Sequence, residues 1–390
     1  MPKSAKLLKT FRYKAVVSKT TATHAEHWLW KCRQLYNLSL EQKITAYRRC
    51  GIHLSAFDQN NELPELKRAF PDFAVVGWQV LQNVTARVEH AFQGFFDRIK
   101  AGKGKAGFPR FKSADRYHSF TLSQAGWTLE GRYLHIKRVG IFKLHLSRPI
   151  EGTIKTVTVK RDRCGDWWVS FACEDVPPKE WKKPLREKVG IDVGLKHFLV
   201  DSDPESQPIE NPRFYQAAQA KLRRQQRREA RRKKGSKRRK KARVLTAQSH
   251  RRVRNLRQDF LHKASTAFVQ RYQEIHVEDL KVANMVKNRH LSKAIFDAGW
   301  STFFEMLTYK AAEAGRKLLK VDPRGTSQRC SGCGETVPKT LAERVHQCKY
   351  CGLTLCRDKN AAYNLEQAQP ARGPGQGLQA LTERVATTVV

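Results

Sequence analysis

Two pairs of cysteines near the carboxyl end constrain the fold more than any other feature of the sequence. Each pair has the form Cys-x-x-Cys followed by glycine, and 14 residues separate Cys330 and Cys333 from Cys348 and Cys351. Four thiolates at this spacing match the tetrahedral shell of Zn²⁺, and each glycine lets the backbone turn beside its pair. The pattern predicts a zinc ribbon. With four protein ligands and no open position, its metal should be structural and not catalytic.

Two further side chains lie close enough in sequence to be considered as ligands. Cys356 follows the last pair by five residues, and His346 precedes that pair by two. We interpret Cys356 as a free thiol, with an alternate ligand as the minority interpretation, and His346 as a bystander.

The charge of the chain indicates a polyanionic partner. Lysine and arginine number 75 against 36 acidic residues, a formal net charge of +39. In residues 221–243, 15 of 23 side chains are Lys or Arg and only Glu229 is acidic. Because each phosphate contact releases condensed counterions, this run favours a nucleic-acid backbone as its partner. An exposed, solvated face is the alternative.

A second basic segment is the glycine-rich loop KGKAGFPRFK at residues 103–112. Its small residues would let backbone amides and ammonium groups approach a phosphate closely. An ordinary solvated loop explains the pattern equally well.

Length and hydropathy bound the architecture. The chain has 390 residues, of which 40% are hydrophobic, enough for two or three cores. The longest apolar runs, such as residues 73–76, are far shorter than the roughly 20 residues of a membrane span. The basic amino terminus is not followed by the apolar region and cleavage site of a signal peptide. We therefore expect a multi-domain cytosolic protein without a membrane segment.

The first half of the chain has the pattern of a β domain interrupted by helices. Residues 7–17 are strand-like, and residues 119–172 alternate apolar and polar positions, which predicts a meander of strands and a small antiparallel barrel. The first strand is expected to pair with this meander. The helices of residues 19–104 would then be an insertion into the β domain.

Two amphipathic helices are expected within that insertion. The first begins with a capping-box pattern at Thr23 and stops near Gly51. The second has its apolar stripe at residues 81–99 and closes at Gly102.

The second half alternates strands and helices after a proline-rich linker around Pro177 and Pro184. Such alternation predicts an α/β domain with a mixed sheet. The expected elements are strands at residues 188–194 and 197–200, a helix at 256–272, a strand at 274–277, a helix at 298–316 and a strand at 317–321.

Three carboxylates stand at the ends of these elements. Asp192 lies within an apolar strand. Glu278 ends the strand expected at residues 274–277, and Asp279 is its neighbour. Asp358 begins a helix that runs to about Glu366. Taken singly, each has an ordinary interpretation: a satisfied buried acid, a strand-end charge and a helix N-cap. Together they offer the oxygen ligands that Mg²⁺ prefers, and two such ions can hydrolyse a phosphodiester. A nuclease would also explain the charge.

An ordered set of motifs is similar to one family, the TnpB proteins of insertion sequences, relatives of the type V CRISPR effector nucleases. The resemblance covers most of the chain, through about residue 366. The motifs are GIDVGLK at 190–196, RQDFLHK at 257–263, VEDL at 277–280, DAGW at 297–300, TSQ at 326–328 and RDKNAAYN at 357–364. Cys356 departs from the family, whose members often carry Asp or another polar residue there.

The resemblance implies an α+β multi-domain fold. Its parts would be a wedge β-barrel with an inserted helical recognition lobe, and a RuvC-like nuclease domain of RNase H type with an inserted zinc ribbon. The implied boundaries are 1–18 and 105–183 for the barrel, 19–104 for the lobe, 184–326 and 355–366 for the nuclease, 327–354 for the ribbon and 367–390 for a mobile tail.

The resemblance also implies a function. Asp192, Glu278 and Asp358 match the family's catalytic triad, which would hold Mg²⁺, most simply as two ions, beside the structural Zn²⁺. A guide RNA from the end of the transposable element would direct the protein to double-stranded DNA beside a short adjacent motif, in the prokaryotic cytosol or nucleoid. We expect an RNA-guided, Mg²⁺-dependent DNA endonuclease in which base pairing supplies specificity.

Three alternatives remain open. A DNA-strand transferase acting directly on transposon ends also uses three acids on an RNase H fold, although its usual order is Asp, Asp, Glu and here the order is Asp, Glu, Asp. A regulator that has lost cleavage would bind DNA under RNA guidance, but would not need intact acids. A basic zinc-ribbon RNA-binding protein would not need acids at strand ends.

Overall fold

The computed structural model describes residues 8–102, 106–340 and 343–368. The chain divides between Pro177 and Pro178 into two compact units, each with its own sheet and core. Residues 103–105 of the basic loop and residues 369–390 of the expected mobile tail lie outside the described residues. Within the described part, no helix combines the length and apolar character that crossing a membrane requires.

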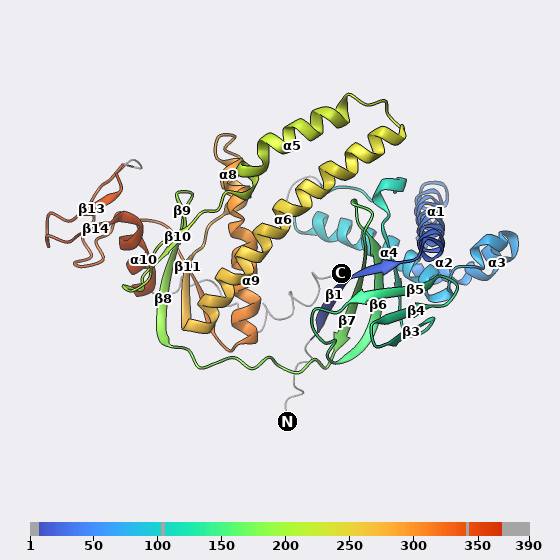
Figure 1. The fold of residues 1–390 in the computed structure, drawn as a ribbon, viewed down its shortest axis with the longest axis horizontal. Coiled ribbons are helices and arrows are strands. Elements are labelled where there is room, and N and C mark those ends of the chain that lie inside the picture. Colours follow the sequence, from blue (N-terminus) through green and yellow to red (C-terminus); the bar gives the residue numbers. More distant parts are fainter. Residues whose placement is uncertain (1–7, 103–105, 341–342, 369–390) are drawn as a thin grey trace. The chain divides into compact units, whose positions relative to one another are not determined.

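The first unit is built on a seven-stranded antiparallel sheet with the order β2-β6-β7-β1-β5-β4-β3 (Figure 1). Its central strand, β1, pairs with β7 on one side and β5 on the other. The expected pairing of the first strand with the meander is confirmed. The strands are β1 (Lys9–Val17), β2 (Ser119–Leu122), β3 (Trp127–Glu130), β4 (Tyr133–Ile136), β5 (Gly140–His145), β6 (Thr153–Arg161) and β7 (Trp167–Glu174).

The sheet is curled into a half-barrel, so the expected small antiparallel barrel is formed only in part. Strands β2 and β3 form its two edges, and among the described residues no ladder joins them. Helices cover the apolar surface that closure would otherwise bury: the ring of Trp28 in the first helix lies 5.4 Å from that of Phe120 on β2, within one continuous core. Burial against helices therefore replaces closure.

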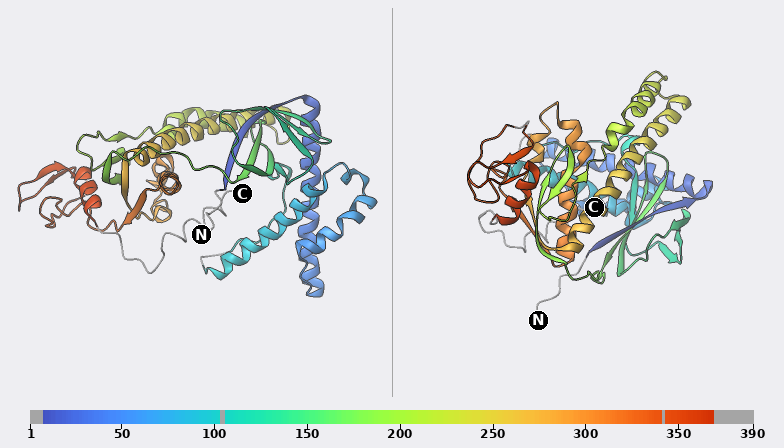
Figure 2. Two further views of the ribbon diagram at one scale, coloured as in Figure 1. Left: turned by 90° about the horizontal axis from the view of Figure 1, so that it is seen from below. Right: turned by 60° about the vertical axis from the view of Figure 1, so that its left-hand side comes forward.

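Four α-helices connect β1 to β2, and α4 runs obliquely against α1 (Figure 2). The first begins four residues before the expected Thr23, because Ser18 directly after β1 caps it by accepting a hydrogen bond from the Thr21 N–H at 3.1 Å. It ends at Gly51 (φ 69°), as expected. The helices are α1 (Lys19–Cys50), α2 (Ala56–Asn61), α3 (Leu63–Ala69) and α4 (Trp78–Lys100), with single 3₁₀ turns at Pro71–Phe73 and Ala114–Arg116.

The second unit has the mixed sheet that the sequence predicts, in the order β10-β9-β8-β11-β12. Strands β8, β11 and β12 are parallel neighbours, and β9 and β10 add to the β8 edge in antiparallel fashion. The strands are β8 (Arg186–Val193), β9 (His197–Asp201), β10 (Ile209–Glu210), β11 (Tyr272–Glu278) and β12 (Lys317–Val321), with a separate ribbon of β13 (Val345–Gln347) and β14 (Thr354–Cys356).

Helices lie on both faces of this sheet (Figure 1). The apolar side chains of β8 and β11, such as Ile191 and Val277, pack with Phe268 of α6 and Phe303 of α9 in one core. The other face carries α10. The helices are α5 (Phe214–Ala230), α6 (Lys237–Arg271), α7 (Val282–Met285), α8 (Ser292–Ala298), α9 (Trp300–Glu313) and α10 (Arg357–Gln367).

Two helix predictions in this unit are corrected. The helix expected at residues 256–272 is only the second half of α6, which begins at Lys237 where Ser236 accepts a hydrogen bond from the Arg239 N–H at 3.1 Å. The basic run therefore continues into the helix despite its like charges. The helix expected at residues 298–316 is two helices, because Gly299 (φ 75°) ends α8 and starts α9.

Candidate functional site

Parallel pairing brings two of the candidate acids side by side. Ile191 of β8 is in register with Val277 of β11. The next residue is Asp192 on β8 and Glu278 on β11, so these two acids are neighbours. Register neighbours in a parallel pair have side chains on the same face of the sheet. Ile191 and Val277 point into the core of α6 and α9. Both carboxylates therefore lie on the opposite face, which carries α10.

A glycine sets how closely α10 approaches this face. A Cβ atom built on Gly190 would lie 2.0 Å from the carbonyl oxygen of Ala362, so the helix backbone rests directly on β8. Buried His276 of β11 adds a second attachment, because its Nδ1 lies 2.9 Å from the carbonyl oxygen of Leu365. Asp358 precedes Ala362 by one helical turn and so faces the same strand. The structure thus brings the third acid to the other two.

The three carboxylates interact electrostatically. Burial, and after it the charges of Glu278 and Asp358, raises the pKa of Asp192 well above its ordinary value. Burial also raises the pKa of Glu278, while a hydrogen bond with Thr326 Oγ1 acts in the opposite direction. Like charges held together in a buried place favour a cation. The donor set of hard oxygens fits Mg²⁺.

Arginines accompany Asp358. Its Oδ1 lies 3.2 Å from Nη2 of Arg357, and its Oδ2 lies 3.9 Å from Nη1 of Arg344. The side chain of Arg344 is 51% exposed. Guanidinium groups at this distance can pair with the carboxylate and equally with a phosphate.

Asp279 does not join the cluster. Its side chain is 53% exposed and lies 3.7 Å from the ammonium group of Lys320 on β12. The Asp279 N–H continues the pairing of β11 with β12, donating to the carbonyl of Val321 at 2.8 Å. Of the two acids that end β11, Glu278 is therefore the one beside Asp192.

The four cysteines form a compact cluster that can hold a metal ion. Their four Sγ atoms all lie within 4.8 Å of one another. The Sγ atoms of Cys330 and Cys351 are 3.6 Å apart, as are those of Cys333 and Cys348. Tetrahedral Zn²⁺ with bonds of about 2.3 Å would separate its sulfurs by about 3.8 Å.

The glycines and the two bystanders behave as the sequence indicates. Gly334 (φ 82°) and Gly352 (φ 75°) adopt the left-handed conformation at the turn after each pair. His346 is fully buried and lies against the ammonium group of Lys339, outside the thiolate cluster. Cys356 is exposed, at the start of α10, and also lies outside it.

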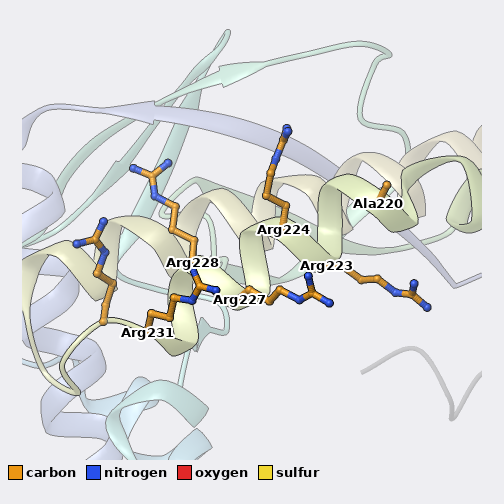
Figure 3. A pocket seen from close by; sticks show the side chains of 7 residues that line it. Ala220, Arg223, Arg224, Arg227, Arg228 and Arg231 are labelled. Carbon is orange, nitrogen blue, oxygen red and sulfur yellow. The ribbon is translucent and has the colours of Figure 1, made fainter.

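An open groove of about 780 Å³ runs along α5 (Figure 3). Leu222 is the buried residue of this helix, and α5 packs against α6. Figure 3 shows Arg224 and Arg228 pointing to one side, while Arg223 and Arg227 point to another. The helical spacing therefore produces two rows of guanidinium groups. The groove is lined by Ala220, Arg223, Arg224, Arg227, Arg228, Arg231 and Arg232.

The buried carboxylate of Asp297 holds the start of this helix, a role that the sequence patterns did not predict. Asp297 of α8 accepts hydrogen bonds from the N–H groups of Tyr215 (2.8 Å) and Gln216 (3.1 Å) in the first turn of α5. It also pairs with Arg257 of α6 at 2.9 Å. An acid at a helix N-terminus is stabilising. The DAGW motif contained this signal, but an N-cap supplied from another helix cannot be recognised from sequence alone.

The described part of the glycine-rich loop lines a second groove, of about 320 Å³, in the first unit. The side chain of Asn37 holds the loop on α1 by bonding to both the N–H (2.8 Å) and the carbonyl (3.0 Å) of Lys112. Phe108 and Phe111 are about half exposed. The basic side chains of the groove are His90, Arg98, Arg110, Lys112 and Arg116.

Known proteins resemble the chain in sequence and in fold. Residues 170–289 match the family described as "Probable transposase" (OrfB_IS605), and residues 300–365 match the "Cas12f1-like, TNB domain". A Streptomyces pristinaespiralis protein named as an RNA-guided DNA endonuclease is 33% identical over 382 residues, 95% of this chain and 92% of that protein. InsQ of Escherichia coli (strain K12), named in the same way, is 32% identical over 305 residues, 74% of this chain and 73% of that protein.

A solved structure shares the fold. The Cas12f1 chain in a cryo-EM structure titled as its complex with sgRNA and target DNA superposes with a TM-score of 0.56 at 14% identity. The match covers 93% of this chain and 99% of that chain. The sequence matches, in particular the relative that is 33% identical over 95% of this chain, show that the chain belongs to the transposon-associated TnpB family.

Proposed function

We propose that the chain is an RNA-guided, Mg²⁺-dependent DNA endonuclease whose catalytic carboxylates are Asp192, Glu278 and Asp358. The single observation that carries the proposal is the convergence of these acids from β8, β11 and α10 on one face of the sheet, where burial and mutual repulsion raise the pKa of Asp192. The names of the relatives as RNA-guided DNA endonucleases support the same activity.

The residues of the chain supply distinct parts of the reaction. When bound by the carboxylates, Mg²⁺, most simply as two ions, would activate a water and stabilise the leaving oxygen of a phosphodiester. Thr326 would orient Glu278, since its Oγ1 lies 2.9 Å from Glu278 Oε1. Arg344, half exposed beside Asp358, would pair with the scissile phosphate.

We assign the parts of the fold accordingly. The sheet of the second unit would be a RuvC-like domain of RNase H type at residues 184–326 and 355–366, with the cysteine-bearing segment 327–354 inserted as a structural Zn²⁺ ribbon. The sheet of the first unit would be the wedge domain at residues 1–18 and 105–183, and its helices at 19–104 the recognition lobe. The order of strands and helices and the sulfur spacing support this assignment.

Nucleic acid would bind along the basic surfaces. The groove on α5 is lined by arginines and one alanine, so it can neutralise a phosphate backbone without reading bases. The groove beside Phe108 and Phe111 offers exposed rings together with cations, a combination suited to phosphate contact and base stacking. A guide RNA from the transposon end and a double-stranded target DNA are the partners we propose, in the prokaryotic cytosol or nucleoid.

The test is to change the guide. RNA that copurifies with the protein is sequenced, its guide segment is replaced, and double-stranded DNA carrying the new complement beside the original adjacent motif is incubated with Mg²⁺. The proposal predicts that cleavage moves to the new complement. Cleavage of transposon ends by RNA-free protein would favour the strand transferase, and guided binding without cleavage would favour the regulator.

A further inference from the structure

Two buried asparagines on α10 hold the segment that connects the carboxylates to the cysteine cluster. Asn360 is fully buried and uses both ends of its amide: Oδ1 accepts from the N–H of Ser331 at 2.9 Å, and Nδ2 donates to the carbonyl of Arg329 at 2.7 Å. Ser331 lies inside the first cysteine pair. One end of Asn360 therefore fixes the backbone between Cys330 and Cys333.

Asn364, one helical turn later, continues the contact toward the acids. Its Nδ2 donates to the carbonyl of Arg329 at 2.7 Å and to that of Thr326 at 2.8 Å. The hydroxyl of the same Thr326 lies 2.9 Å from Glu278 Oε1. A continuous path of hydrogen bonds thus runs from the first cysteine pair, across α10, to a candidate metal-binding carboxylate.

We propose that Asn360, Asn364 and Thr326 are positioning residues that join the cysteine cluster to the carboxylate site, so that the order of one supports the metal affinity of the other. The inference rests on the proposed function for its carboxylate half. Its cysteine half rests on the thiolate geometry alone.

The chemistry of the path supports a positioning role beyond packing. Buried amides and carbonyls are costly when they lose their partners, so the arrangement has few alternatives of similar energy. Asn360 and Asn364 lie on the same helix as Asp358, which places α10 between both sites. Outer contacts of this kind orient metal ligands, and their loss typically costs about 10- to 100-fold in metal affinity.

The three residues contact different parts of the path, so their variants should affect the two metal sites differently. Thr326 contacts the acid end, Asn360 contacts the cysteine end and Asn364 joins the two. Binding of Mn²⁺, a paramagnetic substitute for Mg²⁺, is followed in the full-length, zinc-loaded protein by electron paramagnetic resonance. The release of zinc to the chromogenic chelator 4-(2-pyridylazo)resorcinol is followed in parallel. Neither measurement requires RNA or cleavage.

The expected results differ for each variant. Thr326→Val should weaken Mn²⁺ binding about 10-fold without changing zinc release, while Thr326→Ser, which keeps the hydroxyl, should bind Mn²⁺ like the wild type. Asn360→Ala should accelerate zinc release, and Asn364→Ala should change both properties. Asn255→Ala, at an exposed position of α6, is the matched control and should change neither.

Glu278→Gln distinguishes the proposed carboxylate metal site from the positioning role of the three residues. It should remove Mn²⁺ binding and leave zinc release as in the wild type, which assigns the Mn²⁺ signal to the carboxylates. Absence of Mn²⁺ binding by the wild type would overturn the proposed metal site and the inference with it. Wild-type Mn²⁺ binding that is unchanged in both Asn364→Ala and Thr326→Val would overturn the inference alone. Because Thr326 is only partly buried, its pair of variants decides the matter even if Asn364→Ala fails to fold.

Discussion

Gly190 of β8 lies directly beneath the backbone of α10, with its Cα so close to the carbonyl of Ala362 that an added Cβ would stand 2.0 Å from that oxygen and 2.6 Å from the amide nitrogen of Glu366. Neither contact can be relieved by rotating a side chain, because both atoms belong to the helix backbone. The distance between Asp192 and Asp358 therefore depends on the absence of a side chain two residues before Asp192.

Gly190→Ala should displace α10 and separate Asp358 from the other two acids. We expect a loss of stability of about 1–3 kcal/mol, typical of overpacking, and a larger relative loss of cleavage. Thermal unfolding and cleavage rates measure the two effects. Gly77→Ala is the control, since an added Cβ there meets only ordinary contacts of 3.7 Å and longer, and its φ of −58° suits any residue. A Gly190→Ala protein with wild-type cleavage would show that α10 does not position a catalytic group.

The arginine rows of α5 should contribute to affinity by neutralising phosphates. Replacing Arg223, Arg227 and Arg231 with Ala should reduce the slope of log affinity against log salt by about 0.9 for each duplex DNA phosphate that is no longer neutralised. Binding at several salt concentrations gives the slope. The matched variant with Lys at the same three positions keeps the charge and should keep the slope. Equal slopes in the wild type and the Ala variant would make α5 a solvated face.

The cysteine cluster should bind about one Zn²⁺ per chain, because its four thiolates complete one tetrahedral shell. Cys348→Ser should lower the zinc content and, with it, the solubility and activity, since metal binding stabilises a segment with little core of its own. Elemental analysis and a solubility assay measure these effects. Cys356→Ser, at an exposed thiol outside the cluster, should leave the zinc content and the solubility as in the wild type. Active protein free of zinc would contradict the assignment.

Buried Lys310 of α9 should make stability depend on pH. Burial lowers its pKa to about 8, although its ammonium group donates to the carbonyl of His262 and to the hydroxyls of Ser265 and Thr266. Between about pH 8 and about 10.4, the ordinary value for lysine, the unfolded chain binds more protons than the folded one, so the wild type gains stability as pH rises.

Lys310→Met removes this titration. The stability of the variant relative to the wild type should therefore be greatest below pH 8 and fall as the pH rises toward 10. Denaturant unfolding of both proteins at several pH values measures the difference. A difference that stays constant across this range would show that the folded-state pKa of Lys310 is not lowered.

Sequence patterns predicted the parts of this fold that depend on local periodicity and spacing. The strands β8 and β9, the span of β12 and the approach of the four cysteines follow from alternation and pair spacing. Element boundaries were less predictable where two signals compete. Ser18, directly after β1, caps α1 in place of Thr23, so the helix begins four residues earlier than the capping-box pattern indicates.

Contacts between distant segments could not be predicted in the same way. The N-cap that Asp297 supplies to α5 and the amide contacts of Asn360 and Asn364 join residues about 30 to 80 positions apart in the chain. Their motifs were visible, but residue type alone does not identify the partner of a buried polar group. The extent of barrel closure could not be predicted either, because covering helices can bury the apolar surface that closure would bury.

The most direct test of the central claim compares two neighbouring acids at the end of β11. Glu278 stands beside Asp192, whereas Asp279 is half exposed and faces Lys320. Cleavage of guide-complementary DNA is measured in Mg²⁺ with wild-type protein, Glu278→Gln and Asp279→Asn, each bound to the same RNA. The account predicts that Glu278→Gln cuts about 10³-fold more slowly or not at all, equivalent to about 4 kcal/mol, while Asp279→Asn cuts at nearly the wild-type rate. Undiminished cutting by Glu278→Gln, or loss of cutting in Asp279→Asn alone, would contradict it.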